Sequence, residues 1–278
     1  MIIPIVNRFT CSKKQLPMFK QLINNKNMKP IIDYTNENYL NHKNNFLEIK
    51  YLCKHYSNET IAVKLSSLNV NNKTDVENYM DEIMNISINN NNTILIDAEN
   101  YDIQDKINDI TDKFMEIYNK NNTNIFKTYQ LYRNDYLGIL ENDLKKQRDY
   151  SIGFKLVRGA YYNQDKIHNI LFNTIEETHA NYNEGIRLFI DNFKLHDKLI
   201  CATHNENSIK YALELIKQKN LTNIEFAQLM GMSDNMSSKL SNNYTVYKYL
   251  PYGDFKDTLP YLIRRLYENY PMIMNIFK

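Results

Sequence analysis

The chain has 278 residues and a net charge of +2, with 34 basic and 32 acidic side chains. This balance argues against a nucleic-acid partner, because no block of like charge forms a basic stripe. The three cysteines are scattered, without the spacing of a disulfide framework or of a metal site. We therefore expect a small-molecule ligand, a reducing compartment and no bound metal.

The first stretch with a clear pattern is "KKQLPMFKQLI", residues 13–23, which predicts an amphipathic helix. The 32 residues before Asp33 carry no acidic side chain, so an organelle-targeting segment is the alternative. No run reaches the roughly 18 apolar residues of a membrane span, and the secretory-signal pattern is missing. We expect an intracellular protein without a transmembrane span, with the choice between cytoplasm and mitochondrion left open.

Eight runs of strand character follow, separated by stretches of helical periodicity and by Asn-rich loops. This alternation is typical of parallel strands joined by crossover helices. The interval between the fifth and sixth runs is long, which predicts an extra helix around residues 174–186. The runs begin at Ile31, Ile61, Thr93, Ile125, Ile152, Leu199, Asn223 and Thr245.

Eight units of similar length favour an α/β fold, a (β/α)8 TIM-type barrel with an N-terminal helical segment. No linker or composition shift divides the chain, so we expect one domain over residues 1–278. An open doubly wound sheet is the alternative. However, no strand is followed by a G-x-G-x-x-G turn, and the chain has only six glycines.

Polar residues gather where the strands end, which is where barrels of this kind bind ligands. Taken singly, a charged residue at a strand end often just enters solvent. Lys64 differs, because it interrupts the hydrophobic run "IAVKLSSL", and we expect Asp97 to be its partner. Lys155 interrupts "GFKLVRGA" in the same way, while His204 is either a core imidazole or a ligand contact.

A helix is predicted for residues 258–269, near the chain end, with an apolar stripe at Leu259, Leu262, Ile263 and Leu266. Its other face is either solvated, with an ordinary i,i+4 ion pair, or an anion clamp made of two guanidinium groups. That face carries Tyr261, Arg264, Arg265 and Glu268. The apolar tail "YPMIMNIFK" favours core packing and leaves peripheral membrane contact as the alternative.

Eight segments in order resemble the signature segments of the proline dehydrogenase family: "VKLSSL", "LIDAE", "KTYQLY", "KLVRGAYY", "ATHNENS", "FAQLMGMSD", "VYKYLPYG" and "PYLIRRLYEN". The resemblance implies a (β/α)8 barrel that holds FAD noncovalently, with L-proline against the flavin. It implies the first step of proline catabolism: hydride transfer from proline C5 to flavin N5 yields 1-pyrroline-5-carboxylate, and the electrons pass to a quinone-type acceptor. The chain resembles the monofunctional form, and its oligomeric state is undecided.

The resemblance also assigns roles to residues, with Asp97 and Lys155 as the catalytic pair. Many bacterial members have arginine in place of Lys155. The substrate would be bound by Glu37, Lys64, Leu229, Tyr249, Tyr261, Arg264 and Arg265. FAD would be bound by Ala98, Gln130, Val157, Arg158, Gly159, Ala160, Tyr161, Thr203, His204 and Glu268.

Three alternatives remain from the sequence. A hydroxyproline dehydrogenase on the same barrel would need room for a ring hydroxyl, and the bulk of Tyr249 argues against it. Lys64 or Lys155 could instead be the Schiff-base lysine of an aldolase-like barrel, which needs no flavin. A catalytically silent binding protein could keep the same scaffold.

Overall fold

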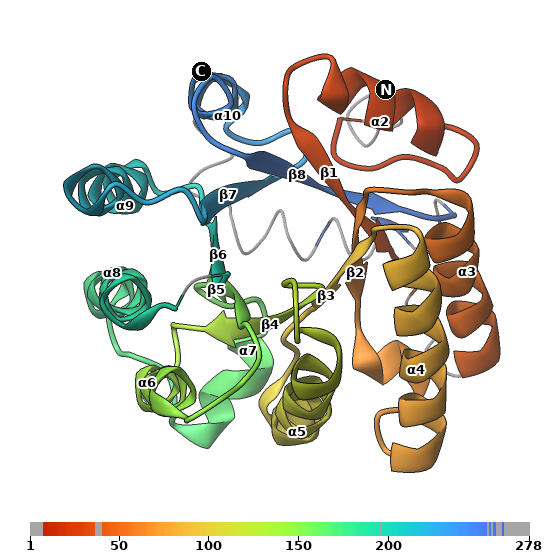
Figure 1. Ribbon diagram of the computed structural model, residues 1–278, viewed down its shortest axis with the longest axis horizontal. Helices are drawn as coiled ribbons and strands as arrows, with labels where there is room; N and C mark the ends of the chain where they lie inside the picture. Colours follow the sequence, from red (N-terminus) through yellow and green to blue (C-terminus); the bar gives the residue numbers. More distant parts are fainter. Residues whose placement is uncertain are drawn as a thin grey trace.

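Eight parallel strands close into a barrel in the order β1 to β8, and the main helices pack around its outside (Figure 1). The computed structural model describes residues 8–36, 41–194 and 196–254, together with residues 256, 258, 259 and 263. The strands are β1 Lys29–Tyr34, β2 Thr60–Val63, β3 Thr93–Ile96, β4 Ile125–Gln130, β5 Gly153–Val157, β6 Lys198–Ala202, β7 Ile224–Leu229 and β8 Val246–Tyr252. The barrel confirms the predicted fold class and excludes the open sheet.

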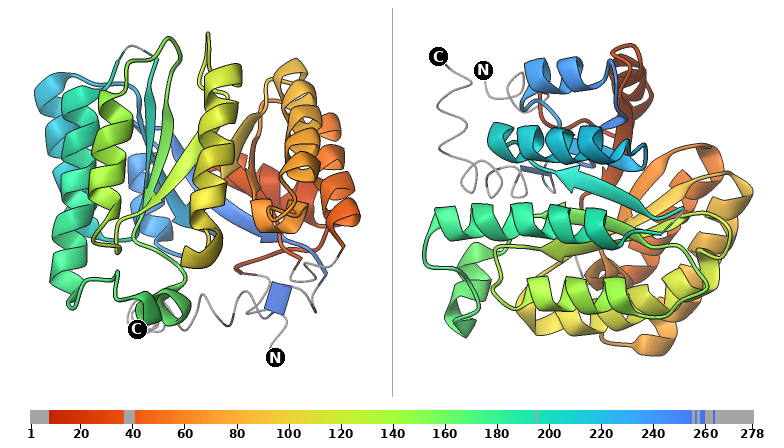
Figure 2. Two further views of the ribbon diagram at one scale, coloured as in Figure 1. Left: turned by 90° about the horizontal axis from the view of Figure 1, so that it is seen from below. Right: turned by 60° about the vertical axis from the view of Figure 1, so that its left-hand side comes forward.

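The helices alternate with the strands along the chain and lie outside the barrel, as Figure 2 shows from two further sides. The predicted N-terminal helix is present as α2, which buries Leu16, Phe19 and Ile23 at helical spacing. Its bounds and those of the other helices are α2 Leu16–Asn24, α3 His42–His55, η1 Leu65–Leu68, α4 Lys73–Asn89, α5 Tyr101–Tyr118, α6 Tyr136–Lys145, α7 Tyr162–Asp165, η2 Lys166–His168, α8 Ile175–Asn192, α9 Glu206–Lys219 and α10 Asp234–Leu240.

The long interval between β5 and β6 differs in detail from its prediction. The helix around residues 174–186 is α8, the ordinary crossover helix of this unit, and the additional elements are the short α7 and η2 before it. Thr174 caps α8 with a capping box: its hydroxyl accepts from the Glu177 N–H, and the Glu177 carboxylate accepts from the Thr174 N–H. This cap explains why a helix begins here rather than earlier.

The strands alternate between a face inside the barrel and a face under the helices. Apolar side chains that point inward form a separate core cluster of Ile31, Ala62, Leu95, Phe126, Ile200, Ala227, Tyr247 and Tyr249. Toward the carboxyl ends the inward positions become polar, at Asp33 in β1, Lys64 after β2 and Asp97 after β3. The barrel interior is therefore a packed plug below a polar mouth.

The Asn-rich loops supply backbone conformations that most residues avoid. Within the described residues, eight non-glycine residues have positive φ, and six of them are asparagine. Asparagine tolerates the left-handed region better than most side chains, so it can close a turn without glycine. The six are Asn27, Asn58, Asn69, Asn91, Asn169 and Asn220.

Candidate active site

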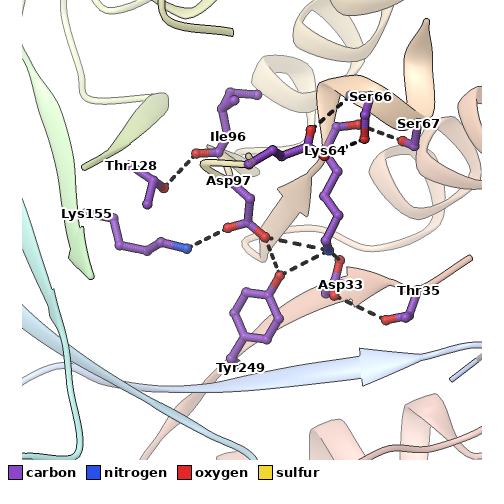
Figure 3. Close-up of polar contacts among 11 residues, drawn as sticks. Asp33, Thr35, Lys64, Ser66, Ser67, Ile96, Asp97, Thr128, Lys155 and Tyr249 are labelled. Carbon is purple, nitrogen blue, oxygen red and sulfur yellow. Dashed lines mark hydrogen bonds and ion pairs between the residues drawn. The ribbon is translucent and has the colours of Figure 1, made fainter. Parts of the chain in front are cut away.

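Five charged or polar side chains from five strands of the barrel meet at its mouth (Figure 3). Asp33 comes from β1, Lys64 and Asp97 directly follow β2 and β3, Lys155 lies in β5, and Tyr249 lies in β8. The structure thus brings together both predicted catalytic residues and two of the predicted substrate contacts.

Asp97 lies at the centre of this group. Its Oδ1 accepts a hydrogen bond from Lys155 Nζ at 2.6 Å, and its Oδ2 accepts one from the Tyr249 hydroxyl at 2.5 Å. Burial alone would raise the pKa of Asp97, but the ammonium groups of Lys155 and Lys64 outweigh it and lower the pKa to about 2. Asp97 is therefore an anion at neutral pH.

Lys64 has a different first partner from the one expected. Its ammonium pairs with Asp33 Oδ1, while Asp97 Oδ2 lies at 3.6 Å and the Tyr249 hydroxyl at 3.4 Å. The expected ion pair of Lys64 with Asp97 is present only at the longer distance, because the Asp97 oxygens accept their short hydrogen bonds from Lys155 and Tyr249. Positive and negative groups alternate from Asp33 through Lys64 and Asp97 to Lys155.

The backbone around Lys64 and Asp97 is fixed by buried polar side chains. Glu99 accepts hydrogen bonds from the N–H and the hydroxyl of Ser66, two residues after Lys64, and burial raises the pKa of Glu99. Thr128 donates to the Ile96 carbonyl at 2.7 Å, at the end of β3. These bonds set the two strand ends that carry the cation and the anion.

Arg158 follows β5 and belongs to the predicted cofactor wall. Its three nitrogens donate to neutral acceptors: Nε to His179 Nδ1 at 3.0 Å, Nη1 to Thr203 Oγ1 at 2.6 Å and Nη2 to Ser208 Oγ at 2.9 Å. Among the described residues no carboxylate forms an ion pair with it, and burial lowers its pKa. A half-buried guanidinium group without a counter-ion suits an anionic ligand.

Gln130, at the end of β4, also points to a ligand. Its Nε2 donates to the Glu99 carbonyl at 2.5 Å, whereas its buried Oε1 has no hydrogen-bond donor within the described part of the chain. An unpaired buried acceptor of this kind is uncommon in folded proteins and requires an explanation.

His204 is held as a neutral imidazole. The Leu229 N–H donates to its Nε2 at 3.4 Å, so Nδ1 carries the proton and donates to Ser233 Oγ at 3.1 Å. Burial, with the nearby charges of Lys248 and Arg158, lowers the pKa of His204 to about 4. This arrangement also places the predicted substrate contact Leu229 beside a predicted cofactor contact.

The segment after β5 is closely packed at Gly159. Gly159 has φ +151°, and a Cβ at this position would meet the Tyr132 ring at 2.2 Å. Tyr132 is fixed in turn, because its N–H donates to the Arg158 carbonyl at 2.7 Å and its hydroxyl to Asp165 at 2.5 Å. The remaining predicted cofactor contacts are half-buried at Ala98, Val157 and Ala160 and buried at Tyr161.

Five predicted site residues lie outside the described residues: Glu37, Tyr261, Arg264, Arg265 and Glu268. Sequence reasoning missed the roles of others. Asp33 belongs to the predicted strand run that begins at Ile31, but one sequence alone does not indicate which cation it meets. His179 and Ser208 lie in helices α8 and α9, and no local pattern signals that both would meet Arg158.

Comparison with known proteins places the chain in a family. The family model for proline dehydrogenase matches residues 20–272, and the chain belongs to this family. Mitochondrial proline dehydrogenase 1 of Dictyostelium discoideum is 32% identical over 224 residues, covering 74% of this chain and 39% of that protein. Hydroxyproline dehydrogenase of Xenopus laevis is 34% identical over 203 residues, covering 66% of this chain and 43% of that protein.

A solved structure agrees on the fold. Proline utilization A from Bdellovibrio bacteriovorus, inactivated by N-propargylglycine, superposes with a TM-score of 0.85 at 16% identity, over 96% of this chain and 33% of that one. The chain thus spans well under half the length of these relatives. Every helix within the described residues is too short or too polar to span a membrane.

Proposed function

We propose that this chain oxidises L-proline to 1-pyrroline-5-carboxylate in proline catabolism, with FAD as the bound cofactor. The observation that carries the proposal is the bonded group of Asp97, Lys155, Tyr249 and Lys64 at the mouth of the barrel. Each of these residues comes from one of the eight segments that resemble the family's signature: "VKLSSL", "LIDAE", "KLVRGAYY" and "VYKYLPYG".

The residues present fit a flavin nucleotide. The unpaired Oε1 of Gln130 can accept from a ring or ribityl donor, and Arg158 offers a charge that no carboxylate among the described residues neutralises. When bound, FAD would supply the hydride acceptor of the reaction. Gln130, Arg158, Thr203 and His204 would hold it, with Gly159 letting the chain approach closely.

The side chains of the protein would orient the substrate and supply charged groups around it. Lys64 would bind the substrate carboxylate, and Tyr249 and Leu229 would pack against the ring. Asp97 fixes Lys155 and Tyr249 through its two oxygens. Because its pKa is about 2, Asp97 is a poor proton acceptor at neutral pH, so the substrate amine would lose its proton to water.

Hydroxyproline is the second candidate substrate, because a hydroxyproline dehydrogenase is among the relatives. Tyr249 is inward-facing and 8% exposed, and its hydroxyl proton is engaged by Asp97. A 4-hydroxyl group on the substrate ring would therefore crowd against the Tyr249 ring and find its hydroxyl proton already engaged. This arrangement favours proline over hydroxyproline as the substrate.

A Schiff-base aldolase fits the site less well. Both candidate lysines are ion-paired with carboxylates, Lys155 with Asp97 and Lys64 with Asp33. An opposite charge at this distance favours the ammonium form, whereas a Schiff-base lysine must be neutral to attack a carbonyl.

The proposal is tested by mixing the purified, flavin-loaded protein anaerobically with L-proline or with trans-4-hydroxyproline and following the visible flavin band. We expect bleaching by proline at a lower concentration than by hydroxyproline. Protein that binds no flavin, or flavin that proline leaves oxidised, would overturn the proposal. We extend it to a quinone-type electron acceptor, which a soluble quinone analogue in steady-state turnover would test.

A further inference from the structure

Asp33 is the one group in the bonded cluster that the proposed function leaves without a role. Its side chain is 1% exposed and points into the barrel mouth from β1. Oδ1 accepts from the Lys64 ammonium, and Oδ2 accepts from the Thr35 hydroxyl at 3.2 Å. A buried carboxylate is costly unless it is paired, so its placement beside Lys64 calls for a reason.

The reason is the number of donor groups that surround the Asp97 carboxylate. Three donors reach its two oxygens: Lys155 takes Oδ1, while Tyr249 at 2.5 Å and Lys64 at 3.6 Å share Oδ2. Without another anion, the ammonium of Lys64 would close on Oδ2 and compete with the Tyr249 hydroxyl. Asp33 draws the ammonium away and leaves that oxygen to Tyr249.

We propose that Asp33 is a positioning residue that holds the Lys64 ammonium beside Asp97 rather than on it, where Lys64 can bind the substrate's carboxylate. This inference rests on the proposed function, because it gives Lys64 a carboxylate ligand. Asp33 touches neither the substrate nor the cofactor, and it acts through Lys64 alone.

The test uses the flavin-loaded protein with Asp33→Asn, Lys64→Met and the double variant. We measure kcat and KM for L-proline. We also measure the Kd of cyclopentanecarboxylate, which keeps the acid group on an apolar ring, from the change it causes in the flavin spectrum. In Asp33→Asn we expect KM and Kd to rise about tenfold with kcat within about threefold of the parent. When Lys64→Met is already present, adding Asp33→Asn should raise KM and Kd by less than about twofold.

Asp143→Asn is the matched control. Asp143 is a carboxylate that accepts from a buried lysine, Lys127, at 2.8 Å, but on the helix side of the barrel wall. It should lower thermal stability without changing KM. If Asp33→Asn fails to retain flavin, Thr35→Val removes only the hydroxyl donor to Asp33 and should raise KM about two- to threefold.

The outcomes separate the two proposals. Parent protein that proline fails to reduce overturns the proposed function, and with it this inference. If the parent is reduced but Asp33→Asn, or Thr35→Val in its place, keeps the parental KM and Kd, only the positioning role is overturned. A full tenfold rise in KM and Kd when Asp33→Asn is added to Lys64→Met would equally overturn the positioning role, because Asp33 would then act independently of Lys64.

Discussion

The Tyr249 hydroxyl donates to Asp97 Oδ2 at 2.5 Å, although the two residues are 152 positions apart in the chain. The bond joins β8 to the end of β3 across the barrel mouth, past β1 and β2. It fixes the orientation of an aromatic ring and of a carboxylate at once, and the first prediction follows from it.

Tyr249→Phe keeps the ring and removes the bond. We expect kcat/KM for L-proline to fall about tenfold while flavin content stays unchanged, because Asp97 loses a donor and can turn toward Lys64. Tyr247→Phe is the control, since Tyr247 is two residues earlier on the same strand and donates to Glu225 at 3.1 Å. Equal kinetics for both variants would contradict the role of the Tyr249 hydroxyl.

Lys155 is the closest cation to Asp97 among the described residues, at 2.6 Å. Lys155→Met leaves a buried carboxylate short of its main partner, so we expect flavin reduction in stopped flow to slow by about 100-fold. Lys155→Arg keeps the charge and should retain activity within about fivefold. A rate for Lys155→Met close to that of Lys155→Arg would show that the charge at this position is dispensable.

Arg158 should govern cofactor retention. Arg158→Met removes a guanidinium group that no carboxylate in the described ranges neutralises. We expect the flavin Kd to rise about 10- to 100-fold, measured by fluorescence titration of flavin-stripped protein. Arg187→Met serves for comparison, because Arg187 on α8 pairs with Glu184 and Asp191 at the surface. Normal flavin affinity in Arg158→Met would rule out this residue as an anion contact.

Alanine substitutions at two glycines should change the unfolding free energy in opposite directions. Gly159→Ala places a Cβ against the Tyr132 ring at a residue with φ +151°, so we expect a loss of about 2–4 kcal/mol in unfolding free energy. Gly138→Ala, in helix α6 with no atom within 4 Å of the new Cβ, should gain about 0.5–1 kcal/mol. Urea unfolding of both variants measures the difference, and a stable Gly159→Ala protein would disprove the close packing.

His204 predicts a dependence of stability on pH. Its pKa is lowered from an ordinary 6.5 to about 4 in the folded protein, so the unfolded chain binds the proton first as pH falls. Stability should therefore decline by roughly 1–3 kcal/mol between about pH 6.5 and pH 4. In His204→Gln this part of the decline should vanish in urea unfolding at a series of pH values, and an unchanged profile would assign the decline to other groups.

The sequence predicts the barrel well because strand and helix periodicities repeat eight times. β4 occupies the residues of the run "IFKTYQ" without a shift, and the other strands begin within two residues of their predicted starts. The resemblance to one family named the residues around Asp97. No local sequence pattern indicates which charged side chains pair across the barrel. Lys64 was expected to meet Asp97 first, yet its first partner is Asp33, because the choice depends on how many donors already reach Asp97.

The same limit applies to Arg158. Its three acceptors come from α8, from the turn after β6 and from α9, which are adjacent only once the barrel has closed. Hydrophobic periodicity places each element, but the direction of a polar side chain at its end is decided by tertiary contacts.

The asparagines with positive φ have an evolutionary consequence. Six tight turns are encoded without glycine in the described part of a chain that has six glycines in all. Amino-acid usage in the loops can therefore drift toward amides while the arrangement at the barrel mouth persists.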